Sequence, residues 1–158
     1  MYIEKYWGDY IGGTDDSLTL VDYLEDKQKE EISLGEILSD TGLDKLNGAF
    51  QKTDSLSVFV DGLETEFYYA IDLITDLAAL LLECKVNGSV NLCDLLEDTE
   101  PDWIVRITAT PEEHELMNKA LMDFSAAPLT YDLSEMVPEE DMMEMAAICE
   151  QLRKELYG

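Results

Sequence analysis

The chain has 158 residues, and its 36 acidic side chains outnumber its 10 basic ones, which leaves a formal net charge of −26 at neutral pH. Apolar residues make up 46% of the chain, which is too many for an acidic disordered segment and enough for the core of a single domain over residues 1–158. The charge excludes ordinary binding to nucleic acids and to anionic membranes, because both are negatively charged and are recognised through Lys and Arg.

The first predicted elements are a short strand and a helix. Residues 1–14 mix aromatic residues with glycine, a pattern typical of a short strand followed by a tight turn. Asp15 or Asp16 is the expected helix N-cap, and the helix should run to about residue 27. Its apolar stripe consists of Leu20, Val21 and Leu24. The alternation of Leu18, Leu20 and Asp22 leaves a strand as the alternative for this segment.

A short helix and a β-hairpin are predicted next. Ser33 and Glu36 have the spacing of a capping box, and the helix that they open should stop at Gly42. Residues 56–69 place Asp61-Gly62 between two runs of β-prone residues. Because both central residues of a type I′ turn need positive φ, this pair predicts a hairpin.

The remaining elements alternate between helix and strand. Leucine and alanine cover so much of the helix from residue 71 or 72 to 86 that it should be largely buried, and residues 103–109 should form a strand beside the hairpin. Further helices are predicted after Thr110-Pro111 and after Pro138. The predicted fold is helix-rich α+β, with a small antiparallel sheet of the hairpin 56–69 and strand 103–109 packed on helices.

The sequence also predicts a cytoplasmic protein. No run reaches the ~20 apolar residues that a membrane span requires. The N-terminal residues carry acids where a signal peptide has a basic region, and they contain no apolar core. The three cysteines form no CxxC pair, which is typical of buried thiols in a reducing compartment.

Motifs that would carry chemistry are missing from the sequence. His114 is the single histidine and is expected to be a surface residue of its helix, so no nucleophile is predicted to have a base. Neither a zinc-ligand spacing, a calcium loop nor a phosphate-binding loop is present. We therefore expect no enzyme, no metal and no cofactor. Carboxylate pairs remain available for a small hydrolase, because an acid-rich chain always provides some pair at a suitable spacing.

The acidic residues occur in local groups, and three of these groups are candidates for contact with a partner. The first group, Asp9, Asp15 and Asp16, stands near the aromatic residues Trp7 and Tyr10, which could anchor an interface. The alternative is that Trp7 and Tyr10 cover the edge of the core and that the neighbouring acids only cap a helix or keep the surface solvated. The candidate residues are Trp7, Asp9, Tyr10, Asp15, Asp16, Glu97, Asp98, Glu139, Glu140 and Asp141.

The segment Tyr6-Trp7-Gly8-Asp9-Tyr10-Ile11-Gly12-Gly13-Thr14-Asp15-Asp16-Ser17-Leu18-Thr19-Leu20, in a small acidic chain without catalytic residues, resembles the immunity proteins of bacterial polymorphic and contact-dependent toxin systems. The resemblance implies a protein that binds a cognate toxin and blocks its active site or an adjacent surface. Many such toxins are nucleases with basic faces, which an acidic protein can occupy. An adaptor for a basic cellular protein is the other binding hypothesis; the oligomeric state stays open.

Overall fold

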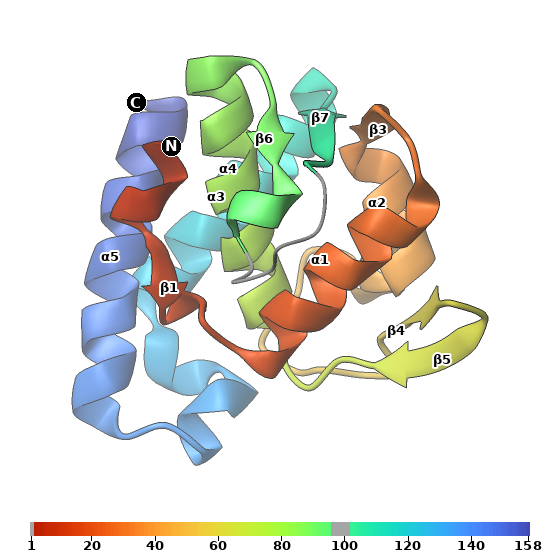
Figure 1. Cartoon of the computed structure of the whole chain (residues 1–158). Helices are drawn as coiled ribbons and strands as arrows, with labels where there is room; N and C mark the ends of the chain where they lie inside the picture. The colour runs from red at the N-terminus through yellow and green to blue at the C-terminus, as the bar shows by residue number, and fades with distance from the viewer. Residues whose placement is uncertain (1, 96–101) are drawn as a thin grey trace.

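The computed structural model describes residues 2–95 and 102–158, and within these residues it is a helix-rich α+β protein, as predicted. The helices are α1 (Asp15–Lys27), α2 (Leu34–Thr41), α3 (Ala70–Asn87), α4 (Pro111–Ala126) and α5 (Glu139–Tyr157). The strands are β1 (Trp7–Asp9), β2 (Ile11–Gly12), β3 (Glu31–Ser33), β4 (Ser57–Val60), β5 (Leu63–Glu66), β6 (Val90–Asn91) and β7 (Ile104–Thr108). Figure 1 shows α3 in the middle of the molecule, with the N-terminal segment lying along α5.

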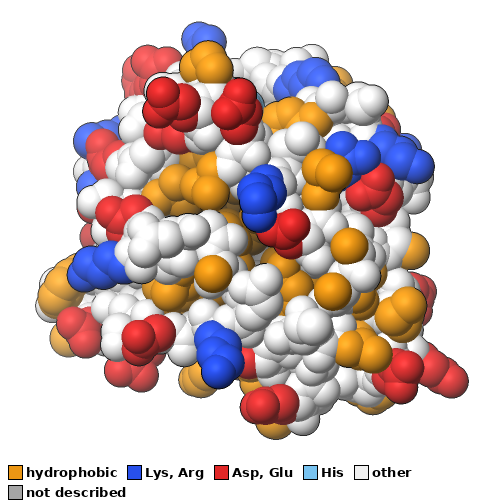
Figure 2. Space-filling model, turned by 180° about the vertical axis from the view of Figure 1, so that it is seen from behind, with side chains coloured by type: hydrophobic (Ala, Val, Ile, Leu, Met, Phe, Trp, Pro, Cys, Tyr) orange, Lys and Arg blue, Asp and Glu red, His pale blue; other side chains and the backbone are white. Residues whose placement is uncertain are grey.

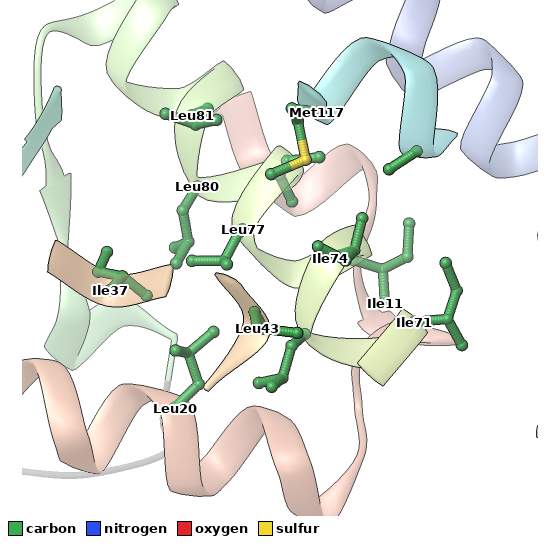
Figure 3. Close-up of a cluster of buried hydrophobic side chains, with 14 of the residues drawn as sticks. Ile11, Leu20, Ile37, Leu43, Ile71, Ile74, Leu77, Leu80, Leu81 and Met117 are labelled. Carbon is green, nitrogen blue, oxygen red and sulfur yellow. The ribbon is translucent and has the colours of Figure 1, made fainter. Parts of the chain in front are cut away.

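Helix α3 is the centre of the core. Every residue from Ala70 to Glu83 is buried, as its wide apolar face predicts, and Gly88 ends the helix in a left-handed conformation. Figure 3 shows Ile74, Leu77 and Leu81 of this helix among side chains contributed by α1, α2 and α4. Because so many of its side chains are buried, α3 is the element against which the other helices pack their apolar faces.

The N-termini of α1, α2 and α4 are set by side-chain hydrogen bonds between residues three positions apart. Thr110 and Glu113 form the predicted capping box at the start of α4, and Ser33 caps α2. The prediction for α1 is wrong by one or two residues, since the N-cap is Thr14 and not Asp15 or Asp16. Thr14 and Ser17 exchange hydrogen bonds, which leaves both aspartates in the first turn, where the helix dipole favours acidic side chains.

The hairpin forms as predicted, but strand β7 does not lie beside it. β4 and β5 pair antiparallel around Asp61 and Gly62, whose φ angles of 52° and 78° fit a type I′ turn. β7 instead pairs in parallel with β3 and antiparallel with β6. The partners β3 and β6 have only three and two residues, which is too short for a period-2 pattern to reveal them.

None of the helices in the described ranges is both long and apolar enough to cross a membrane.

Candidate functional site

The N-terminal segment is held against α5 by tyrosine hydroxyl groups. The Tyr10 hydroxyl donates to Asp141 Oδ1 and to Glu144 Oε2, each at 3.0 Å. About three helical turns further along α5, the hydroxyls of Tyr2 and Tyr6 donate to the Glu155 carboxylate. Partial burial, followed by the two carboxylates, raises the pKa of the Tyr10 hydroxyl, so it stays protonated and acts as a donor.

These contacts bring together two of the three predicted groups. We define the acidic–aromatic surface as Trp7, Asp9, Tyr10, Asp141 and Glu144. Asp9 and Glu144 are exposed, whereas the two aromatic side chains and Asp141 are half-buried. A depression of about 370 Å³ between β1 and α5 lies beside these residues and is lined partly by Trp7, Asp9 and Tyr10. The exposed Glu139 and Glu140 belong to the first turn of α5, directly before Asp141.

Trp7 packs on the backbone of Gly12. A Cβ atom placed on Gly12, whose φ is +80°, would lie 2.1 Å from the Trp7 ring. Both Trp7 and Tyr10 also pack against the buried core. The aromatic residues of the predicted site therefore cover the edge of the core, and their remaining exposed parts are what a partner can contact.

Replacing Gly12 by alanine tests this packing. Both Gly12→Ala and the control Gly62→Ala place a side chain at positive φ, but only Gly12 faces a neighbour within 4 Å. We expect Gly12→Ala to lower the free energy of unfolding by about 1–2 kcal/mol more than Gly62→Ala, because the Trp7 ring must move. Urea unfolding with Trp fluorescence measures the difference. Equal losses in the two variants would show that Trp7 does not rest on Gly12.

Asp16 does not belong to the exposed surface. Its side chain is only 2% exposed, and its two oxygens accept from the backbone N–H groups of Tyr68 and Tyr69, each at 2.9 Å. These bonds fix the chain just before α3 begins. Because both of its carboxylate oxygens are already engaged by backbone N–H donors, we leave Asp16 out of the candidate surface. Its neighbour Asp15 is exposed.

Glu97 and Asp98 lie outside the described residues. The acidic group to which they belong therefore stays a prediction.

Three buried acids on α3 were not singled out from the sequence. Asp76 Oδ1 accepts from Gly12 N at 2.8 Å and Oδ2 from the Ser17 hydroxyl at 2.7 Å, while Glu83 Oε1 accepts from Ile3 N at 3.2 Å. Asp72 is the third, and it is 4% exposed. Burial raises the pKa of Asp76 to about 7 and that of Asp72 to about 8. The signal that could have revealed them in the sequence is the presence of acidic residues within a helix that is otherwise almost entirely apolar.

The described residues carry no group of acids, cysteines and histidines able to hold a metal ion. Cys93 and Cys149 are buried and Cys84 is half-buried. His114 is half-buried rather than on the surface, because it packs against Tyr157 at the end of α5. Its Nδ1 lies 2.9 Å from the Tyr157 hydroxyl, which is a phenol whose pKa burial raises and not an activated nucleophile.

Several of the few basic side chains pair with acids away from the acidic–aromatic surface. Lys27 lies 2.8 Å from Glu36 and 2.9 Å from Asp40, and Arg153 lies 2.6 Å from Glu150. On the face seen in Figure 2, Lys and Arg side chains stand between acidic ones. The acidic–aromatic surface itself contains three carboxylates, those of Asp9, Asp141 and Glu144, and no basic side chain, while Lys5 lines the depression beside it.

A comparison with protein families gives the match that decides the classification. The sequence model of the family described as Immunity protein 68 matches residues 2–156. The chain belongs to this family. No curated protein and no solved structure matches it. Membership in the immunity protein 68 family confirms the resemblance to immunity proteins, and it implies a toxin as partner and an inhibitor rather than a catalyst.

Proposed function

We propose that this immunity protein neutralises a cognate bacterial toxin by forming a stoichiometric complex with it in the cytoplasm of the producing cell. The toxin is a nuclease-type domain with a basic surface. Membership in the immunity protein 68 family carries the proposal of toxin neutralisation. The net charge of −26 supports a basic partner, because a surface built to bind phosphate attracts carboxylates in the same way.

The acidic–aromatic surface is the contact region that we propose. It combines exposed carboxylates, which can pair bidentately with arginine, with half-buried aromatic rings that lose little side-chain entropy on binding. Asp9 comes from the N-terminal segment and Asp141 from α5, and the Tyr10 hydroxyl holds these two elements together. A partner that lies across both elements therefore meets a surface that is already ordered, which favours affinity.

A titration tests the proposed function. The toxin encoded by the neighbouring gene is mixed with increasing amounts of the full chain, and cleavage of DNA and RNA is followed. We expect cleavage to stop at one equivalent of immunity protein. Full cleavage at a tenfold excess would overturn the proposed function, and continued inhibition by substoichiometric amounts would indicate an enzyme, such as the carboxylate-dependent hydrolase considered above.

A charge-reversal variant tests the location of the surface. Asp9→Lys within the acidic–aromatic surface, combined with Glu140→Lys beside Asp141 at its edge, should weaken toxin binding by at least about tenfold, since it places two cations opposite a basic partner. The matched control, Glu64→Lys with Glu66→Lys, changes the net charge equally on two exposed residues of the hairpin. Calorimetry or surface plasmon resonance provides both affinities. Equal losses would mean that only the net charge matters and that the surface lies elsewhere.

Salt should act mainly on the rate of association. Between 50 and 500 mM NaCl the Debye length falls from about 14 Å to about 4 Å, so long-range attraction between the acidic protein and a basic toxin is screened. We expect the association rate constant to fall by at least about tenfold and the dissociation rate constant to change less. Stopped-flow fluorescence measures both. An association rate that is independent of salt would remove the argument for a basic partner.

A further inference from the structure

A second acidic feature is a groove where α1 begins. It has a volume of about 320 Å³ and lies between the first turn of α1, Tyr68-Tyr69 and residues 133–137. Figure 1 shows α1 starting in the lower half of the molecule, and Asp16 in its first turn bonds the chain just before α3. The side chains of Tyr68 and Met136 are 65% and 73% exposed, so an apolar and an aromatic side chain stand open at this groove in contact with solvent.

The groove contains a carboxylate without a hydrogen-bond donor. Asp72 lines it and is 4% exposed, and within residues 2–95 and 102–158 no donor reaches its carboxylate oxygens. Asp16 and Asp76 of the same region do have donors, which are backbone N–H groups and the Ser17 hydroxyl. A buried carboxylate without a partner is unfavourable, and a cation placed beside it removes that penalty.

The surroundings of Asp72 increase its demand for a cation. Burial first, and then the neighbouring carboxylates of Asp76, Asp16 and Asp132, raise the pKa of Asp72, so a cation beside it favours its ionised form. Asp15 is exposed and lines the same groove, so a second carboxylate is available at the rim. A cation bound at the inner carboxyl would hold Asp72 in its ionised form. With Asp15 at the rim and apolar side chains between the two, the groove complements a side chain that has a long aliphatic part and a cationic end.

We propose that this groove receives one lysine or arginine side chain of the toxin. The aliphatic part lies between Tyr68 and Met136, and the cationic end reaches Asp72, with Asp15 at the rim. This inference rests on the proposed function. It extends the interface beyond the acidic–aromatic surface, since Val137 in the groove wall stands two residues before Glu139, where α5 begins. One basic toxin face can therefore contact both regions.

Two variants of the full chain test the groove. Asp72→Asn keeps the size of the side chain but cannot ionise beside a cation, and Tyr68→Ala removes a rim side chain while its backbone N–H still bonds Asp16. We expect each to weaken binding to the toxin by at least tenfold. The matched control Asp94→Asn removes one exposed charge and should change affinity by less than twofold. Circular dichroism and the unfolding midpoint establish that each variant is folded.

Acetylation of the toxin's lysines distinguishes the two cationic side chains. If the affinity ratio between the unmodified protein and Asp72→Asn falls to one on acetylated toxin, the side chain is lysine, and if the ratio persists it is arginine. Affinities of Asp72→Asn and Tyr68→Ala within twofold of the unmodified protein would overturn the groove proposal. That result is distinct from failure of the proposed function, in which the unmodified protein itself does not inhibit the toxin.

Discussion

Replacing Leu77 by alanine should lower the free energy of unfolding by about 2–5 kcal/mol, because burial of the leucine is lost and a cavity remains. Leu77 has no solvent exposure and lies on α3 among the side chains shown in Figure 3. The surrounding helices are joined to α3 by many other buried residues, so they cannot collapse into the space. This loss would be a large share of the 5–15 kcal/mol that stabilises an ordinary domain.

The control for Leu77→Ala is Leu63→Ala. Leu63 is 72% exposed in the hairpin, so its truncation should change the free energy of unfolding by less than about 0.5 kcal/mol. Urea unfolding at constant pH gives both values, provided that the slope against urea concentration stays the same. A loss below about 1 kcal/mol for Leu77→Ala would show that α3 is not the central helix of the core.

The second large effect is a dependence of stability on pH through Asp72. Its pKa is about 8 in the folded protein, against an ordinary value of 3.8 that applies to the unfolded chain. Between these values the folded state binds a proton that the unfolded state has released, so stability falls as pH rises from about 4 to about 8. Each unit of pKa shift corresponds to 1.36 kcal/mol of stability. Because Asp72 lines an open groove, we expect less than the full value, namely a loss of about 2–4 kcal/mol from this one group across that interval.

Asp72→Asn should remove this contribution, because asparagine stays neutral at every pH. We expect the variant to match the unmodified protein near pH 4 and to be more stable by about 2–4 kcal/mol at pH 8. Asp94→Asn lowers the overall negative charge by the same amount at an exposed position, so it separates the local effect from general repulsion. Urea unfolding at several pH values and 0.3 M NaCl measures both. Parallel curves for the two variants would contradict the role of Asp72.

Asp72→Asn also separates stability from binding. At neutral pH the same substitution is expected to stabilise the free protein and to weaken its complex with the toxin. A buried residue that reduces stability and strengthens binding is typical of a functional site. Improved stability together with unchanged toxin affinity would leave Asp72 as an unfavourable buried charge without a function.

The longer helices and the hairpin followed from local signals in the sequence, whereas the short strands β3 and β6 did not. Thr110, Pro111 and Glu113 define the start of α4, and Asp61-Gly62 defines the hairpin. In each case the hydrogen bonds or the φ angles involve residues within about four positions of one another. The net charge, and with it the expectation of a basic partner, also follows from composition alone. These properties do not depend on how distant segments meet.

The candidate site was decided by the tertiary structure. Tyr10 and Asp141 are both identifiable as candidates, but their hydrogen bond joins residues 131 positions apart. Asp16 and Asp15 are adjacent and chemically identical, and only packing against Tyr68 and Tyr69 buries one and exposes the other. β7 pairs with β3 and β6 instead of the hairpin. The sequence could not show this, because a strand pattern specifies which side chains are buried and not which strand pairs with it. Local sequence therefore determined the helices, the hairpin and the charge of this protein, while contacts between distant residues decided which acids are exposed and which are buried, because burial and hydrogen bonding depend on the complete packing.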